Sequence, residues 1–417
     1  MTLIVPFKAV RPQAQYAKQV ASRPYDVLNS KEARQEAQGN PNSFLHITKS
    51  EIDLPEDEDP HSPLVYEKAK QNLDAFIQRE VLFRESKPCY YIYELVMPGD
   101  SAGNMARKQT GLVAASSIDD YENNIIKKHE FTRPDKEQDR INHIIATGAQ
   151  TGNIFLAYRN VDELDELIQK WQNEKSPVYN FIADDGISHT IWVVSDDQTI
   201  NNITQIFAKK VPCTYIADGH HRAASAAKAR QALDHGSNPG ADYFLTTLFP
   251  ANQLHIMDYN RLVRDLNGLS ADEFFSRLSE NFEISQSGRE PFSPKTLHEF
   301  GVYINGKWYK LIAKPGTFPE DPIGILDVSI LQNNVLDKIL GIRDPRTDKR
   351  IDFVGGIRGL GELEKRVDSG EMKLALSLYP VSIQQLFYIA DTGNVMPPKS
   401  TWFEPKLRDG LLTNLIR

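Results

Sequence analysis

Residues 214–222 read Thr-Tyr-Ile-Ala-Asp-Gly-His-His-Arg, and this stretch decides how the rest of the sequence is interpreted. Its first four residues are typical of a short buried strand, and an alanine-rich helix is predicted directly after it, over 223–233. The polar residues between strand and helix therefore fall at the first helical turn, where backbone N–H groups have no partner within the helix. Because these amides and the helix dipole attract anions, the stretch predicts a phosphate-binding turn.

The residue types in this turn suit a bound phosphate. Gly219 lets the backbone approach an anion closely. His220 and His221 add hydrogen-bond donors, and Arg222 can hold a phosphate through two bonds. Asp218 is unsuited to direct contact with an anion, so we predict that it ligates magnesium or orients a histidine. In the alternative interpretation, Asp218 caps the helix and the histidines form only local hydrogen bonds.

A second group of cationic residues lies upstream, where Pro134 predicts the start of a helix. On that helix Lys136, Arg140 and His143 are spaced i, i+4 and i+7 and therefore share one face. We expect Arg133, Lys136 and Arg140 to steady a phosphate or a substrate carboxylate. A solvated helix face with internal ion pairs explains the same residues equally well.

His129 and Glu130 come just before this predicted helix, in a strongly cationic stretch. A carboxylate in such surroundings can accept a proton from a substrate hydroxyl group. Glu130 is therefore a candidate general base, with His129 beside it as a candidate phosphate or substrate ligand.

Two further stretches are interpreted as structural. The glycine-rich turn 355–361 follows a predicted strand but lacks the Gly-Lys-Ser or Gly-Lys-Thr of a P-loop. The segment 396–406 is rich in proline and is expected to pack over the surface as a cap. The sequence contains no Gly-x-Ser-x-Gly element and no zinc-type spacing of Cys and His.

Composition limits the class of protein. The 417 residues suffice for about two or three domains, and 40% hydrophobic with 25% charged residues is typical of a globular chain. No apolar run approaches the roughly 20 residues that cross a bilayer, and no secretion signal is evident at the N-terminus. The two cysteines, Cys89 and Cys213, are far apart, so we expect a cytoplasmic protein without disulfides. A net charge of −8 argues against nucleic acid as a partner of the whole chain.

The pattern of elements predicts an α+β protein with two domains, at 1–265 and 266–417. Strands are predicted at 90–97 and 109–117, joined by a loop at 99–108, and a short strand is predicted at 43–47. In the second domain a linker is expected at 285–295, followed by a hairpin that turns at Asn305-Gly306. The alternation of helices and strands after residue 327 indicates an α/β arrangement for this domain.

Several motifs of this chain are similar to those of the bacterial and archaeal DUF1015 family, which is uncharacterised. Together they cover nearly the whole sequence. They are Pro24-Tyr25-Asp26-Val27, Asn40-Pro41 with Ser43-Phe44-Leu45-His46, Tyr121-Glu122-Asn123, Lys128-His129-Glu130 with Thr132-Arg133-Pro134-Asp135-Lys136, Ala149-Gln150-Thr151-Gly152, Asp218-Gly219-His220-His221-Arg222, and Met396-Pro397-Pro398-Lys399-Ser400-Thr401.

A more distant resemblance links residues 218–222 to the phosphate-binding box of the ParB/sulfiredoxin superfamily. It implies a ParB/sulfiredoxin-like mixed α/β core at about 110–262, with insertions. The nucleotide-dependent free serine kinases of that superfamily carry the same five letters and an upstream His-Glu element, which implies that Glu130 deprotonates the hydroxyl group. The sulfiredoxin cysteine is replaced by His220, so sulfiredoxin chemistry is not expected.

The leading hypothesis is therefore a kinase that transfers a phosphoryl group from ADP or ATP, with Mg²⁺, to a small hydroxyl metabolite such as free L-serine. The proposed donor site is Gly219 to Arg222, Asp218 is the magnesium ligand, and Glu130, Asp218 and His221 form the catalytic set. One alternative is a nucleotide-binding regulatory module without catalysis. Another is a metal-dependent hydrolase that uses His220, His221 and Asp218. The sequence does not predict an oligomeric state.

Overall fold

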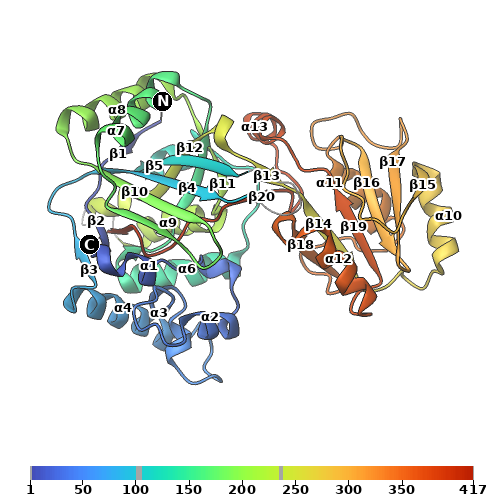
Figure 1. The fold of residues 1–417 in the computed structure, drawn as a ribbon, viewed down its shortest axis with the longest axis horizontal. Coiled ribbons are helices and arrows are strands. Elements are labelled where there is room, and N and C mark those ends of the chain that lie inside the picture. Colours follow the sequence, from blue (N-terminus) through green and yellow to red (C-terminus); the bar gives the residue numbers. More distant parts are fainter. Residues whose placement is uncertain (1, 100–105, 234–237, 417) are drawn as a thin grey trace. The chain divides into compact units, whose positions relative to one another are not determined.

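A mixed sheet of nine strands runs through the first unit of the chain in the computed structural model, which describes residues 2–99, 106–233 and 238–416 (Figure 1). The strand order is β6-β11-β8-β12-β5-β4-β10-β9, and β1 pairs with β5. The pairs β6/β11 and β8/β12 are parallel and the other pairs are antiparallel. The strands are β1 (Ile4–Val5), β4 (Tyr90–Met97), β5 (Arg107–Ser117), β6 (Ile126–Lys127), β8 (Ile154–Tyr158), β9 (Tyr179–Ile182), β10 (Ser188–Val194), β11 (Thr214–Asp218) and β12 (Tyr243–Pro250).

Helices from several parts of the chain pack on this sheet and on one another. The longer ones are α4 (Pro63–Gln78), α6 (Pro134–Thr147), α7 (Asp162–Glu174), α8 (Asp197–Lys210) and α9 (His220–Ala232). The shorter ones are α1 (Ala17–Val20), α2 (Ser30–Ala37), α3 (Leu45–Thr48) and α5 (Ile118–Glu122). Helix α6 packs against both α4 and α9. Because the residues of α9 that enter the core are alanines, this helix contacts the sheet closely.

A small second sheet in this unit contains segments from both ends of the chain. Its order is β3-β2-β21-β7. The bounds are β2 (Ala9–Pro12), β3 (Leu82–Arg84), β7 (Ala149–Gln150) and β21 (Thr413–Leu415). The first unit comprises Met1–Lys128, Thr132–Leu254 and Pro405–Arg417. Residues close to the C-terminus therefore belong to the same unit as the turn at residues 218–222.

The second unit comprises His129–Phe131 and His255–Glu404. Its six-stranded sheet has the order β15-β17-β16-β19-β14-β18, with every pair antiparallel, and β13 pairs separately with β20. The strands are β13 (Ile256–Met257), β14 (Tyr259–Val263), β15 (Phe282–Gly288), β16 (Glu299–Ile304), β17 (Lys307–Ala313), β18 (Ile351–Gly355), β19 (Leu374–Leu378) and β20 (Trp402–Phe403). The helices are α10 (Ala271–Asn281), α11 (Asp327–Leu331), a π-helix (Gln332–Asp337), α12 (Gly359–Asp368) and α13 (Ile383–Asp391).

The mixed α+β class predicted from sequence is confirmed, as are the strands near 90–97 and 109–117 and the hairpin that turns at Asn305-Gly306. Within the predicted loop 99–108, residues 100–105 lie outside the described part of the chain. None of the described helices is both long and apolar enough to cross a membrane.

Two local predictions are wrong. The expected strand at 43–47 is helical, since Leu45–Thr48 form α3, and a short apolar run does not distinguish the two by its pattern. The expected linker at 285–295 begins inside β15, which pairs with β17. Its polar residues are those of an edge strand, whose outer face is exposed to solvent.

The glycine-rich turn 355–361 is explained by packing. A Cβ at Gly355 would lie 2.5 Å from the indole ring of Trp402, and one at Gly356 would lie 3.1 Å from the carbonyl oxygen of Asp258. Gly361, by contrast, has open space around it. These contacts support the structural interpretation of the turn.

We therefore expect Gly355→Ala to lower the free energy of unfolding by about 1–3 kcal/mol, because the new methyl group must displace a packed ring. Gly361→Ala is the matched control from the same turn. It lies within α12 and should be neutral or stabilising by up to about 1 kcal/mol. Urea denaturation of the three proteins measures both values, and equal stabilities of the two variants would contradict this account.

Candidate functional site

The predicted strand–turn–helix is present, with Gly219 as the residue between β11 and α9. Its φ of +95° lies in the left-handed region, which favours glycine, and a Cβ there would lie 3.4 Å from the Cα atom of Ile154. This glycine brings the helix N-terminus back over the sheet directly after the buried strand. The first amides of α9 thus belong to a 13-residue helix, whose dipole favours an anion at this end.

Asp218 does not cap α9, because the N-cap residue is Gly219. The carboxylate of Asp218 instead accepts a hydrogen bond from the ammonium group of Lys406, with Oδ2 and Nζ 2.8 Å apart. Burial alone would raise the pKa of Asp218, but the positive charges of Lys406 and Arg222 outweigh it and hold this pKa well below its usual value. Asp218 is therefore ionised at neutral pH, and Lys406 is a residue of the site that sequence reasoning missed.

His221 connects the turn to the start of α6. Its Nε2 atom accepts a hydrogen bond from the backbone N–H of Arg133, 3.0 Å away, so its proton is on Nδ1 in the neutral ring. The side chain of Arg133 is exposed and pairs with Asp135. Farther along, Ser225 donates a hydrogen bond to the carbonyl oxygen of Glu137 at 3.0 Å, which also joins α9 to α6.

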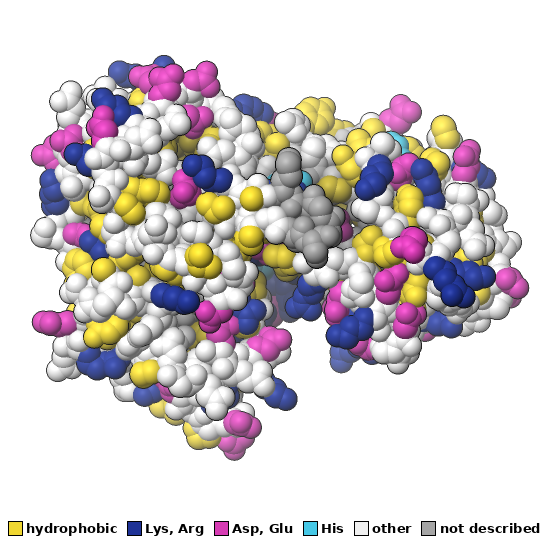
Figure 2. Space-filling model, viewed as in Figure 1, with side chains coloured by type: hydrophobic (Ala, Val, Ile, Leu, Met, Phe, Trp, Pro, Cys, Tyr) yellow, Lys and Arg dark blue, Asp and Glu magenta, His cyan; other side chains and the backbone are white. Residues whose placement is uncertain are grey.

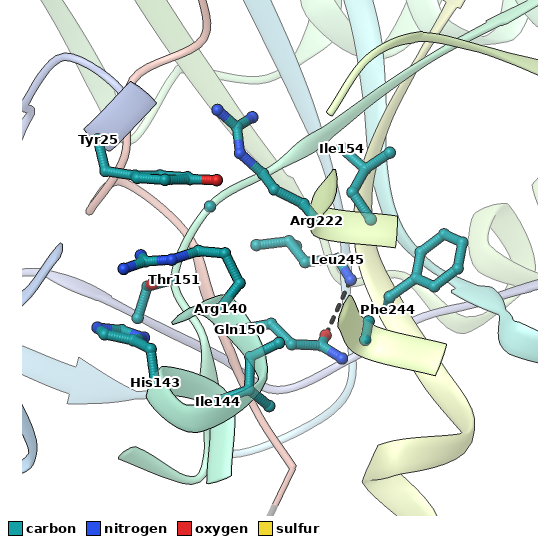
Figure 3. Close-up of a pocket in the computed structure, with 12 residues that line it drawn as sticks. Tyr25, Arg140, His143, Ile144, Gln150, Thr151, Ile154, Arg222, Phe244 and Leu245 are labelled. Atoms are coloured by element: carbon teal, nitrogen blue, oxygen red, sulfur yellow. Dashed lines mark hydrogen bonds between the residues drawn. The ribbon is translucent and has the colours of Figure 1, made fainter. Parts of the chain in front are cut away.

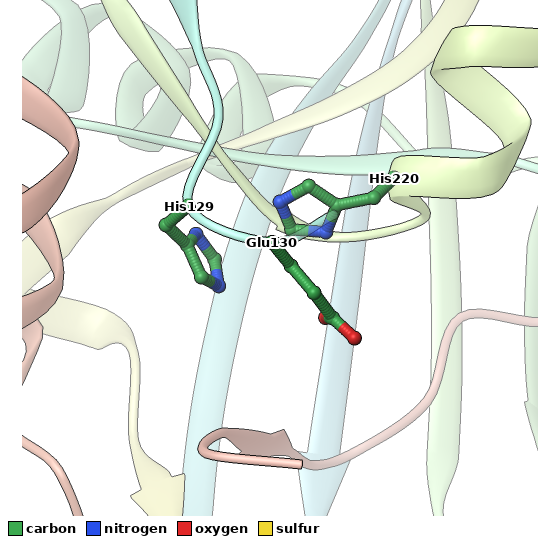
Figure 4. Close-up of side chains that lie close together, drawn as sticks. All are labelled: His129, Glu130 and His220. Atoms are coloured by element: carbon green, nitrogen blue, oxygen red, sulfur yellow. The ribbon is translucent and has the colours of Figure 1, made fainter. Parts of the chain in front are cut away.

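Two constraints place Glu130 near this turn: the pairing of the preceding strand β6 with β11, and the hydrogen bond between Arg133, which follows Glu130, and His221. Strands β6 and β11 are parallel, with Lys127 paired to Tyr215, so the segments that follow them leave the sheet at the same edge. Glu130 comes three residues after Lys127 and three before Arg133, which bonds His221. The ligand atoms of His129, Glu130 and His220 all lie within 4.8 Å of one another (Figure 4).

Arg222 lies close to the turn, but its guanidinium group is engaged by the protein. Nη2 donates to both carboxylate oxygens of Asp26, at 2.9 and 2.8 Å, and Nη1 donates to the carbonyl oxygen of Asn153 at 2.7 Å. The carboxylates of Asp26, Asp409 and Asp218 outweigh burial and raise the pKa of Arg222, which remains charged. Two bonds from Arg222 to a phosphate would therefore require it to release Asp26.

The predicted cationic face of α6 divides into two parts. Lys136 is exposed. Arg140 pairs with Asp139, with Nη2 and Oδ2 2.8 Å apart, and its guanidinium carbon lies 4.1 Å from the centre of the Tyr25 ring. His143 is buried and its Nε2 atom lies 2.9 Å from the carbonyl oxygen of Ile47. Arg140 and His143 therefore line an interior pocket, whereas Lys136 faces solvent.

Residues 4–329 match the model of a family described as a protein of unknown function, DUF1015. This match spans more than half of the chain. The chain belongs to the DUF1015 family. No curated protein matches this DUF1015 chain.

Three solved structures are similar to the DUF1015 chain at low scores. A conserved hypothetical protein from Pyrococcus furiosus has 14% identity and a TM-score of 0.36, covering 73% of this chain and 95% of that one. A free serine kinase in complex with AMP has 12% identity and a TM-score of 0.35, covering 72% and 91%. SbnI with a C-terminal truncation, from Staphylococcus aureus, has 11% identity and a TM-score of 0.31, covering 71% and 85%. These scores are too low to transfer a fold or an activity to this chain.

The DUF1015 chain also buries a carboxyl group beside Arg222. Asp409 is 1% exposed, and burial raises its pKa to about 7; the negative charge of Asp26 adds to this rise, and the positive charges of Arg222 and Arg140 partly oppose it. The folded state therefore keeps this proton up to about pH 7, whereas the unfolded chain loses it near pH 4. Between these values the unfolded state binds fewer protons, so Asp409 makes stability fall as pH rises.

We expect Asp409→Asn to remove this dependence. In the native protein the contribution of Asp409 should lower the free energy of unfolding by up to about 1.4 kcal/mol per pH unit between pH 4 and 7. Denaturant unfolding of both proteins at several pH values gives the difference between their profiles. Parallel profiles across this range would show that Asp409 titrates normally.

Proposed function

We propose that this protein is a nucleotide-dependent kinase that phosphorylates a small hydroxyl metabolite, with free L-serine as the first candidate. The observation that supports it most is the common position of two elements at one sheet edge. Gly219 and the N-terminus of α9 follow β11, and the segment with Glu130 follows the parallel neighbour β6. The first element suits a phosphate and the second supplies a carboxylate.

The phosphates of ADP or ATP would bind at residues 219–222. The backbone amides at the start of α9 would donate to phosphoryl oxygens, and the absence of a side chain at Gly219 allows that approach. His220 and His221 add donors at the same turn. Lys406 forms an ion pair with Asp218, the residue directly before Gly219.

Glu130 would accept the proton of the substrate hydroxyl as its oxygen attacks the terminal phosphorus. One phosphorus–oxygen bond forms to the substrate and the bond to the remaining nucleotide breaks, so ADP yields AMP and ATP yields ADP. Arg133 and Lys136 are exposed cations at the start of α6 and would steady the substrate carboxylate. Such a reaction depends on positioning and on charge stabilisation.

Magnesium bound with the nucleotide would neutralise charge on the transferred phosphoryl group. Asp218 was its predicted ligand. The Oδ2 atom of this carboxylate already accepts from Lys406, which weakens its attraction for a second cation. Only its Oδ1 atom would then face the metal.

The direct test is incubation of the full-length protein with ADP or ATP and L-serine, followed by mass spectrometry for phosphoserine. Threonine, ethanolamine and glycerol serve as alternative acceptors. The proposal predicts a phosphorylated product that requires nucleotide. Tight nucleotide binding with no product from any acceptor would instead favour a regulatory module without catalysis.

A metal-dependent hydrolase remains the second candidate, with a changed set of ligands. The sequence suggested His220, His221 and Asp218, but Nε2 of His221 is used by Arg133 and Asp218 is paired with Lys406. His129, Glu130 and His220 instead offer two imidazoles and a carboxylate, a donor set suited to zinc or other transition metals. Stoichiometric metal in the purified protein, lost in His220→Ala, would favour this candidate over the kinase.

Nucleic acid is the least favoured partner. The net charge is −8, and the face drawn in Figure 2 carries acidic and basic side chains interspersed, without a continuous basic stripe among its described residues. The proposed substrates are therefore small molecules.

A further inference from the structure

A pocket in the first unit is lined by residues of two motifs that have no role in the kinase proposal, Pro24-Tyr25-Asp26-Val27 and Ala149-Gln150-Thr151-Gly152. It lies between α6, α9 and the segment around β7 and is open to solvent on one side. Figure 3 shows the lining side chains converging from these elements. They are Tyr25, Arg140, His143, Ile144, Gln150, Thr151, Gly152, Ile154, Arg222, Ala226, Phe244 and Leu245.

One end of the pocket carries hydrogen-bond donors. The ring of Tyr25 lies between two guanidinium groups, with carbon-to-ring-centre distances of 4.1 Å for Arg140 and 5.5 Å for Arg222, and its hydroxyl group points toward the other lining residues (Figure 3). Arg222 is only 9% exposed, and its Nε–H has no acceptor among the described residues. An unmade hydrogen bond at a buried charged group is costly, so an acceptor supplied by a bound ligand would stabilise this end of the pocket.

These donors are held rigidly. Asp26 fixes the terminal nitrogens of Arg222, and Asp139 fixes Nε and Nη2 of Arg140. Burial raises the pKa of Tyr25 to about 12, so its hydroxyl keeps its proton and remains a donor at neutral pH. Asp26 and Asp139 offset the charges of the two arginines, and the neighbouring Asp409 keeps its proton up to about pH 7. The pocket therefore has little net charge at neutral pH or below and suits at most a monoanion.

The opposite wall is apolar. Ile144, Ile154, Ala226 and Phe244 form it together with Leu245. The neighbouring imidazole of His143 is neutral, since burial and the charge of Arg140 lower its pKa to about 4. A ligand that fits both ends therefore has an acceptor group at one end and a compact hydrophobic body at the other.

We propose that this pocket binds a small monocarboxylate with an aliphatic or aromatic body. One carboxylate oxygen accepts from Nε of Arg222 and from the Tyr25 hydroxyl, while the body packs against Ile154 and Phe244. Nothing in this assignment depends on the kinase proposal, since it concerns binding alone and requires no nucleotide.

Saturation-transfer difference NMR on the full-length protein, with butyrate, isovalerate and the neutral isovaleramide as probes, tests this site. Both carboxylates should bind, and the amide should bind at least about tenfold more weakly, because it lacks the charge that strengthens bonds to arginine. Tyr25→Phe should weaken the carboxylates about tenfold, and Ala226→Leu should abolish binding by filling the apolar end.

Tyr16→Phe, outside the pocket, is the matched control and should bind as the native protein does. If Ala226→Leu does not fold, Tyr25→Phe carries the test alone. The proposal fails if no carboxylate binds at about 50 mM, a concentration that reveals even millimolar affinity. It also fails if acid and amide bind equally, or if Tyr25→Phe has no effect.

Discussion

Glu130→Gln should lower the turnover of the phosphorylation reaction by about 10²–10⁴-fold, because glutamine keeps the shape of the side chain but cannot accept the hydroxyl proton. Nucleotide affinity should change by less than about twofold, since the phosphates are assigned to the start of α9 and not to Glu130. Steady-state kinetics with phosphoserine as the product, combined with calorimetric titration of nucleotide, measures both quantities.

The control is Glu163→Gln on α7, which removes an exposed carboxylate that pairs with Lys210 and has no role in the proposed site. This variant should retain native turnover. If Glu130→Gln is fully active, Glu130 is not the base. If it instead loses nucleotide binding, its carboxylate acts on the donor site rather than on the hydroxyl group.

Gly219→Ala should weaken nucleotide binding by about 10- to 100-fold. Alanine is strained at a φ of +95°, and its methyl group would press against Ile154 and Arg222, so the first amides of α9 would shift from their positions. Hydrogen bonds between charged phosphate oxygens and backbone amides are each strong enough to account for this range. Calorimetric titration with ADP gives the affinity directly.

Gly186→Ala separates this local effect from general strain. Gly186 also has a left-handed φ, of +81°, but it is exposed in the turn between β9 and β10. Both variants should lose about 1–3 kcal/mol of stability. Only Gly219→Ala should lose nucleotide affinity, and equal affinities in the two variants would remove the phosphate site from this turn.

Sequence reasoning located the strand, the glycine and the helix at 214–232 because each of them is specified locally. The apolar strand, the polar turn and the alanine run are adjacent, so periodicity and capping rules apply to them directly. The same locality explains the prediction of a helix from Pro134.

Partners that come from distant parts of the chain could not be predicted in this way. Asp26 lies 196 residues from Arg222, and Lys406 lies 188 residues from Asp218. No spacing rule connects such positions, since the sheet topology and the return of the C-terminal segment create these pairs. The two pairs determine which atoms of the predicted turn are available to a ligand.

Helical periodicity predicts that the cationic residues of α6 act together, but the structure separates them. Lys136 and Arg140 are four residues apart and share a side of the helix, yet Lys136 is exposed whereas Arg140 stacks on Tyr25. Spacing predicts which face of the helix a side chain lies on. Whether that part of the face is buried depends on which neighbouring elements pack against it.

The most direct test of the proposed phosphate site at residues 219–222 compares ADP and adenosine in calorimetric titrations of the native protein. The account predicts that ADP binds more than about tenfold tighter than adenosine, because the start of α9 recognises the phosphates. Equal affinities for the two, or no detectable binding of ADP at millimolar concentration, would contradict it.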